Sequence, residues 1–248
     1  MRTVGVDLAA EPPSTAVAVL DWGPGGARVT DTELPADDDA VLRHAEHADK
    51  VGIDCPLGWP DTFAGFLQAQ REDPAGLDCG PPGAAWRRSL AYRHTDERVR
   101  ELTGLVPLSV ATDRIGLTAM RAVRLQALLA QRGHPVDRTG SGLVVEVYPA
   151  AGLRHWRLPH RRYKGGRNRA ALDALVSALQ QAAPWLDLAG HADLCRRHDH
   201  VLDAVIAALL ARAAALGLTT TPTEAETPRA RTEGWIALPT CALDRLRS

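Results

Sequence analysis

Thr3-Val4-Gly5-Val6-Asp7 and Val51-Gly52-Ile53-Asp54 are two short apolar segments that each end in an aspartate. Their length and apolar content are typical of strands buried in a sheet. A carboxylate at the end of a buried strand loses hydration, which costs free energy unless a counter-charge compensates it. A third acid, Asp203, lies far downstream in the very apolar helical pattern of residues 199–217. We therefore expect three separate segments to bring acids to one site.

The pattern around these segments predicts a mixed β-sheet. Short turns, of which residues 23–26 (Gly-Pro-Gly-Gly) are the clearest, join the first three strands, so these strands are expected to pair antiparallel. A helix over residues 37–47 precedes the fourth strand, which should therefore run parallel to the first. The five expected strands cover residues 2–9, 15–20, 27–34, 51–54 and 143–148.

The remaining sequence favours helices inserted between the strands. We expect insertions around residues 56–140 and 150–198 of a single domain that spans residues 1–248. The expected helices cover residues 37–47, 62–70, 95–102, 112–131, 168–182 and 199–217. This order of elements is that of an RNase H-like α/β fold, in which the first and fourth strands are neighbours. Asp7 and Asp54 would then lie at adjacent carboxyl ends, where open α/β sheets usually bind ligands.

Composition restricts the possible classes of function. The 248 residues include 29 Lys and Arg against 30 Asp and Glu, and the formal net charge of −1 provides no overall basic field for duplex binding. The most apolar stretch, residues 201–218, contains Asp203 and Arg212, so we expect a buried helix rather than a membrane span. Scattered cysteines and the lack of a leader pattern favour a cytoplasmic protein with reduced thiols. The cysteines are Cys55, Cys79, Cys195 and Cys241.

Converging carboxylates predict a site for hard divalent cations. Ionised carboxylates at close range repel one another unless a cation lies between them, and Mg²⁺ or Mn²⁺ prefers oxygen ligands. We expect two ions about 3.5–4 Å apart, as in two-metal phosphodiester cleavage. Asp199 lies four residues before Asp203 and so shares its side of the helix. The expected metal ligands are Asp7, Asp54, Asp199 and Asp203, and the expected catalytic acids are Asp7, Asp54, Glu146 and Asp203.

Basic and aromatic residues are expected to bind the substrate. Residues 154–169 contain six arginines, one lysine and two histidines without any acid, and two aromatic residues interleave with these charges. Such segments can neutralise phosphates and stack bases. Lys164 and Arg167 lie in a glycine turn that can bring them toward a phosphate. Tyr148, on the last predicted strand, and Arg93 complete the expected substrate contacts, and the expected partner is nucleic acid.

These residues also have structural interpretations. Asp7 and Asp54 are typical of turns after strands, and Asp199 is typical of a helix N-cap. Glu146 is compatible with an ion pair to an arginine, Arg93 with a helix cap and its ion pair, and the basic segment with a solvated loop. Asp203 is harder to explain in this way, because the interior of an apolar helix offers a lone carboxylate little compensation.

Six motifs occur in order along nearly the whole chain. They are Val4-Gly-Val-Asp7-Leu-Ala9, Gly52-Ile-Asp54-Cys-Pro-Leu-Gly58, Tyr92-Arg-His-Thr-Asp96, Glu146-Val-Tyr-Pro-Ala150, Leu202-Asp203-Ala204 and Glu233-Gly-Trp-Ile236. Together they resemble the DUF429 family of bacterial and archaeal proteins, whose members are described as predicted RNase H-like nucleases. The resemblance implies an RNase H-like fold and a metal-dependent nuclease ancestry. Residues 199–204 also resemble the last acidic motif of Holliday-junction resolvases, except that His200 stands where a second acid is frequent.

Three functions are compatible with these observations. The first is a metal-dependent nuclease, a hydrolase of DNA or RNA phosphodiesters. The second is a phosphotransferase related to sugar kinases and actin, although Asp7 is followed by Leu8-Ala9-Ala10 instead of the Gly and hydroxyl residues that hold ATP phosphates there. The third is a non-catalytic binding protein that keeps the fold and part of the site.

Overall fold

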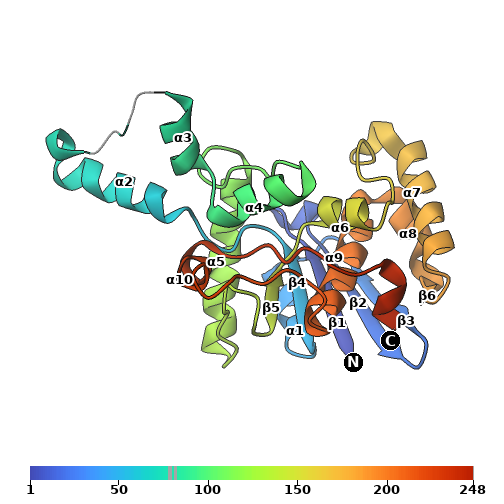
Figure 1. The fold of residues 1–248 in the computed structure, drawn as a ribbon. Coiled ribbons are helices and arrows are strands. Elements are labelled where there is room, and N and C mark those ends of the chain that lie inside the picture. Colours follow the sequence, from blue (N-terminus) through green and yellow to red (C-terminus); the bar gives the residue numbers. More distant parts are fainter. Residues whose placement is uncertain (78–79, 81–82, 248) are drawn as a thin grey trace.

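A mixed six-stranded sheet forms the centre of the fold in a computed structural model that describes residues 1–77, 80 and 83–247 (Figure 1). Its strand order is β5-β4-β1-β2-β3-β6. The strands are β1 (Arg2–Asp7), β2 (Ala16–Gly23), β3 (Gly26–Glu33), β4 (Lys50–Asp54), β5 (Val144–Glu146) and β6 (Leu186–Asp187). β1, β2 and β3 pair antiparallel, whereas β4 runs parallel to β1, and β5 parallel to β4. This arrangement confirms the predicted antiparallel trio with parallel strands beside it.

The sheet has one strand more than the five predicted. β6 pairs with β3 in parallel through Leu186 and Asp187 alone. A strand of two residues is too short to show the alternation by which strands are recognised in a sequence. β5 is shorter than predicted, because Tyr148 and Pro149 already form the start of the next helix.

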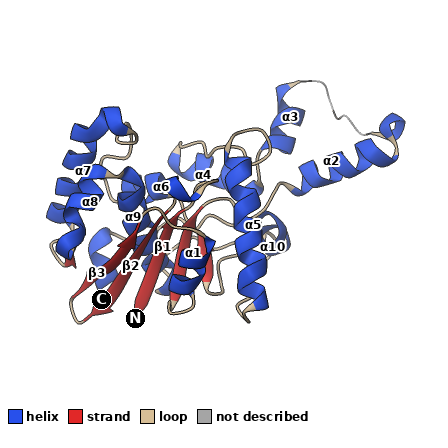
Figure 2. Cartoon of the chain, turned by 180° about the vertical axis from the view of Figure 1, so that it is seen from behind, coloured by secondary structure: helices blue, strands red, loops and turns tan. Residues whose placement is uncertain are grey.

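Helices cover both faces of the sheet (Figure 2). Val4 and Val6 of β1 point to the face that carries α1 and α5, and the opposite face is covered by α9 together with α6, α7 and α8. Within the described residues the α-helices are α1 (Asp38–Ala45), α2 (Asp61–Glu72), α3 (Ala84–Ala91), α4 (His94–Thr103), α5 (Ile115–Gln131), α6 (Pro149–His155), α7 (Arg169–Ala182), α8 (Ala192–Arg197), α9 (Asp199–Ala215) and α10 (Thr227–Glu233).

Two glycines allow α9 to lie directly on the sheet. Gly5 and Gly52 are register partners in β1 and β4, and both face α9. A Cβ atom at Gly5 would lie 1.9 Å from the carbonyl oxygen of Ala204, and one at Gly52 would lie 2.5 Å from that of Ala207. Only glycine permits so close a backbone approach. Because side chains alternate along a strand, Asp7 points to the same face as Gly5 and therefore toward α9.

The first long insertion forms an arm that projects from the body (Figure 1). The arm consists of α2 and α3, neither of which contains a buried residue. The helix predicted from residue 95 begins at His94, because Asp96 accepts the backbone N–H of Arg93 and thereby caps the first turn. Asp37 caps the first turn of α1 by accepting the N–H of Ala40.

The C-terminal segment returns to the sheet. Ile236 forms an isolated parallel bridge with Glu146, and the N–H of Ala237 donates to the carbonyl oxygen of Glu146. Cys55, Cys195 and Cys241 are free thiols, and Cys79 lies outside the described residues. In the described part of the chain, the helices all fall short of the length and apolar character that crossing a bilayer requires.

Candidate active site

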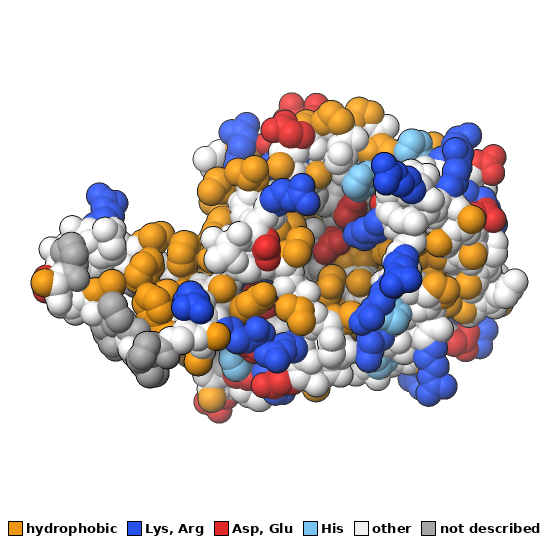
Figure 3. Space-filling view, turned by 90° about the horizontal axis from the view of Figure 1, so that it is seen from above, with side chains coloured by type: hydrophobic (Ala, Val, Ile, Leu, Met, Phe, Trp, Pro, Cys, Tyr) orange, Lys and Arg blue, Asp and Glu red, His pale blue; other side chains and the backbone are white. Residues whose placement is uncertain are grey.

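Asp7 and Asp54 lie side by side where β1 and β4 end. They are register partners in the parallel pair, so their side chains leave the sheet at the same edge. Asp203 reaches this edge from the first turns of α9, which packs against both strands. Asp7 and Asp54 line a cavity of about 400 Å³. Figure 3 shows acidic side chains within a hollow seen from above the sheet, with basic and histidine side chains along its rim.

The Asp203 carboxylate is buried and has two neighbours from one loop. Its Oδ1 accepts a 2.7 Å hydrogen bond from the hydroxyl of Tyr163, and its Oδ2 lies 2.7 Å from the ammonium of Lys164. The side chain of Asp203 is 1% exposed, and this burial raises its pKa to about 6, although Lys164 acts in the opposite direction. In the sequence, Tyr163 is one of the two aromatic residues of the basic segment 154–169, and in the structure it is a direct partner of an acid.

Asp7 has a different partner, His200. The Nδ1 of His200 lies 2.6 Å from Asp7 Oδ2, and this hydrogen bond is the main reason why the pKa of His200 is raised. The histidine is half-buried and lines the same cavity. The sequence pattern predicts no role for His200, which is only a departure from a family motif. The useful signal was its spacing of three residues from Asp203, which places both side chains on one side of a helix.

Asp54 has no hydrogen-bond donor or ion-pair partner among the described side chains. Desolvation raises its pKa well above the ordinary value, and repulsion from Asp7 and Asp203 acts in the same direction, while the Lys164 charge opposes both. The site therefore contains three carboxylates, of which two have raised pKa values. This pattern is typical of a site that is short of positive charge.

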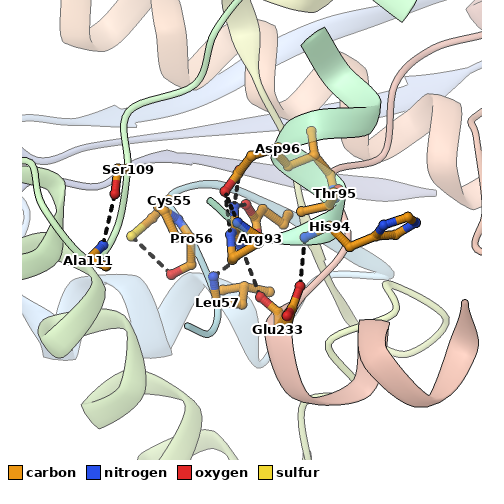
Figure 4. A network of polar contacts seen from close by, with 12 residues as sticks. Cys55, Pro56, Leu57, Arg93, His94, Thr95, Asp96, Ser109, Ala111 and Glu233 are labelled. Atoms are coloured by element: carbon orange, nitrogen blue, oxygen red, sulfur yellow. Dashed lines mark hydrogen bonds and ion pairs between the residues drawn. The ribbon is translucent and has the colours of Figure 1, made fainter. Parts of the chain in front are cut away.

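Glu146 lines the cavity and belongs to a buried ion-pair network centred on Arg93, which Figure 4 shows with Asp96 and Glu233. Its two oxygens accept hydrogen bonds of 2.8 and 2.7 Å from Arg93, and Oε2 also accepts the N–H of Leu57. Arg93, only 1% exposed, also donates to both oxygens of Asp96 and to the carbonyl oxygen of Glu233. Both Glu146 oxygens therefore have hydrogen-bond partners. This geometry agrees with the structural interpretation of Glu146 as the ion-pair partner of an arginine.

Glu233 holds the segments around this network together. It is fully buried, and its carboxylate accepts the backbone N–H groups of Asp61 and His94 and a hydrogen bond from Arg229. In the sequence, Glu233 is part of the motif Glu233-Gly-Trp-Ile236, and the motif predicts no role for it. Asp61 and His94 lie 172 and 139 residues away, so only the ion pair with Arg229, four residues earlier, follows from a local helix spacing.

The other predicted site residues are divided between the cavity and its surroundings. Tyr148, Arg93 and Lys164 line the cavity, Tyr148 and Lys164 at its accessible side. Asp199 does not line it, and its Oδ2 instead accepts the backbone N–H of Gly165 at 3.0 Å. Arg167 is exposed and lies outside the cavity lining.

The donor chemistry of Asp7, Asp54 and Asp203 fits a hard divalent cation. Carboxylate oxygens are the ligands that Mg²⁺ and Mn²⁺ prefer, and the buried Asp203 Oδ2 has the Lys164 ammonium as its only partner among the described residues. Across the described residues, no three His, Cys, Asp or Glu side chains lie close enough together in this structure to hold a metal ion. Lys164 and His200 hold oxygens of Asp203 and Asp7, so binding of an ion requires these contacts to rearrange.

We expect the contribution of Asp203 to stability to decline as the pH rises from about 4 to about 7. The raised pKa of Asp203, about 6, means that the folded protein binds this proton more tightly than the unfolded chain. The stabilisation is complete below the pKa of Asp203 in the unfolded chain, about 4, and it is lost as the pH rises through the pKa of Asp203 in the folded protein. The total loss is on the order of 2–3 kcal/mol. His200 contributes with the same sign, because its pKa is also raised.

Urea denaturation of the wild type and of Asp203→Asn at several pH values isolates the contribution of Asp203. The difference between the two free energies of unfolding should shift in favour of the variant as the pH rises. Parallel pH profiles for the two proteins would contradict the expectation.

A family described as "Protein of unknown function (DUF429)" matches the chain over residues 5–227. No curated protein matches it.

Proposed function

We propose that the chain, which belongs to the DUF429 family of proteins of unknown function, is a divalent-metal-dependent nuclease with an RNase H-like fold. The observation that supports this proposal most directly is the meeting of Asp7, Asp54 and Asp203 at one edge of the sheet. Three carboxylates in one partly buried site repel one another, and binding of a divalent cation relieves that repulsion.

The topology supports the same proposal. Three antiparallel strands are followed by parallel strands, and the acids come from the ends of β1 and β4 and from a helix that crosses them. This is the arrangement expected for an RNase H-like nuclease. We propose Asp7, Asp54 and Asp203 as the ligands of Mg²⁺ or Mn²⁺, with two ions as the expected number. Asp199 and Glu146 have structural partners, so in this proposal they hold the loop 162–166 and Arg93 in place.

When bound, the ions would polarise the phosphodiester and lower the pKa of the attacking water. The residues of the chain perform the remaining tasks. Tyr163 orients Asp203 through its hydroxyl, and Lys164 offers its ammonium to a phosphate oxygen at the entrance of the cavity. His200 keeps its Nε2 free of protein partners, so this atom can deliver a proton to the leaving oxygen as the P–O bond breaks.

The substrate is expected to be DNA or RNA. The basic segment of residues 154–169 provides exposed arginines that can neutralise phosphates. The cavity wall formed by Pro107, Leu108 and Ile115 is apolar and can contact a base or sugar. We propose that the phosphate chain runs between this wall and the basic segment, with the scissile phosphate at the acids.

One contact disfavours the phosphotransferase alternative. The N–H of Ala9, two residues after Asp7, donates to Thr15 Oγ1 and is therefore not available to a nucleotide phosphate. A rise in melting temperature with ATP would revive this alternative.

Cleavage assays test the nuclease proposal. Purified protein is incubated with labelled single-stranded and duplex DNA and RNA in Mg²⁺, Mn²⁺ or EDTA. We expect cleavage that depends on the ion, and a loss of at least about 100-fold in Asp7→Asn, because a ligand to the ion contributes several kcal/mol in the transition state. Asp39→Asn is the matched control, since Asp39 is an exposed acid without a hydrogen-bond or ion-pair partner among the residues that the structure describes.

The outcomes separate the alternatives. Equal cleavage by the wild type and by Asp7→Asn would remove the proposed site. Nucleic-acid binding that is the same in both proteins, without cleavage by either, would favour the non-catalytic binding protein.

A further inference from the structure

The loop of residues 162–166 is attached to α9 at three points. Tyr163 donates to Asp203 Oδ1, the ammonium of Lys164 lies 2.7 Å from Asp203 Oδ2, and the N–H of Gly165 donates to Asp199 Oδ2. Arg162 and Gly165 have φ values of 59° and 85°, so the loop turns sharply on both sides of the two central residues. The loop therefore places one ammonium group directly against the acids.

Lys164 occupies this place without being built into the core. Its side chain is 55% exposed, whereas that of Asp203 is 1% exposed. The lysine stem thus lies along the surface, and only its charged end reaches the buried carboxylate. By contrast, Tyr163 is buried and its hydroxyl would hold Asp203 in position if the ammonium left. Lys164 can therefore move away while the backbone of the loop stays attached.

The other cations of the cavity already have partners. Arg93 is bound by Glu146 and Asp96, and His200 is bound by Asp7. Among the described residues that line the cavity, only Lys164 combines an exposed side chain with a positive charge in contact with Asp203. Its ammonium is also the only partner of Asp203 Oδ2 among the described residues.

We propose that Lys164 is a displaceable internal counter-ion that competes with a divalent cation for Asp203 Oδ2. Without an ion, the ammonium offsets part of the repulsion among the three aspartates. When an ion binds, the ammonium withdraws toward solvent, at the entrance where a substrate phosphate would arrive. This inference rests on the metal site of the proposed function and adds that the chain itself limits the affinity of that site.

Calorimetric titration of Mn²⁺ into the protein without nucleic acid tests the inference. We expect Lys164→Met to bind Mn²⁺ at least about tenfold more tightly than the wild type, because the ion no longer competes with a unit charge at contact distance. Lys164→Arg should remain within about threefold of the wild type, since it keeps the charge. Arg167→Met is the matched control, because it removes a positive charge three residues away that is exposed and outside the cavity.

Thermal unfolding gives a second readout. In EDTA, Lys164→Met should melt below the wild type, because the aspartates have lost their counter-charge. The same variant should show a larger rise in melting temperature with Mn²⁺ than the wild type does. A variant that fails to fold would be recognised by its circular dichroism, and Lys164→Gln then serves as the neutral replacement.

The outcomes of this experiment and of the cleavage assay are separable. Equal or weaker Mn²⁺ binding by Lys164→Met, or no binding by any protein, overturns the inference. Tighter binding by Lys164→Met without cleavage of any nucleic acid by the wild type would support the inference and contradict the nuclease. Ion-dependent cleavage by the wild type, with an unchanged affinity of Lys164→Met for Mn²⁺, would support the nuclease and contradict the inference.

Discussion

Replacement of Arg93 by methionine is expected to lower the free energy of unfolding by about 3–5 kcal/mol, the usual range for removal of one partner from a buried ion pair. Arg93 is 1% exposed and donates to Glu146, to Asp96 and to the carbonyl oxygen of Glu233. The variant leaves two buried carboxylates without their shared cation. The cost arises from this uncompensated burial more than from the lost attraction.

Chemical denaturation at neutral pH measures this effect. Arg100→Met is the matched control, because Arg100 lies in α4 close to Arg93 but makes only a half-exposed ion pair with Glu97. We expect its effect to stay within about 1 kcal/mol. A loss in Arg93→Met no greater than in Arg100→Met would show that the network does not stabilise the fold.

Gly5→Ala is expected to destabilise the protein by about 3 kcal/mol, at the upper end of the range for overpacking a core. The added Cβ would meet the carbonyl oxygen of Ala204 at 1.9 Å and the N–H nitrogen of Ala208 at 2.3 Å. Both are backbone atoms of a helix, so α9 must move as a body. Because Asp203 is part of α9 and moves with it, the variant should also bind Mn²⁺ more weakly.

Gly23→Ala is the control for this substitution. Gly23 also lies in a strand, but a Cβ atom there has no neighbour within 4 Å. Its effect on the free energy of unfolding should be within about 1 kcal/mol, and it should leave Mn²⁺ binding unchanged. Wild-type stability in Gly5→Ala would mean that α9 does not lie against β1 as closely as the structure shows.

The ends of β1 and β4 illustrate what local sequence can predict. Each strand is an apolar run that stops at an acid, and the order of elements made β1 and β4 neighbours. The period of two along a strand then places Asp7 and Asp54 on the same face. The register of the two strands confirms this part of the prediction. Asp203 was recognisable because a lone acid in an apolar helix demands compensation.

Partners of the acids were not predictable in the same way. Glu146 was expected at the site, but its partner Arg93 lies 53 residues away and reaches it only because the first insertion folds back over the sheet. Arg167 and Lys164 belong to one basic segment, and only Lys164 reaches an acid, because the loop turns sharply at Arg162 and Gly165. β6 was missed because two residues carry no periodic signal.

The sequence by itself determined five of the six strands, the antiparallel and parallel pairing of the first four and the edge at which Asp7 and Asp54 emerge, because these depend on hydrophobic periodicity and short turns. Tertiary structure alone decided which cation faces which carboxylate: Arg93 against Glu146, Lys164 against Asp203 and His200 against Asp7. The physical reason is that a buried charge accepts whichever counter-charge the packed loops bring within contact distance. That distance depends on insertions whose paths no local pattern specifies.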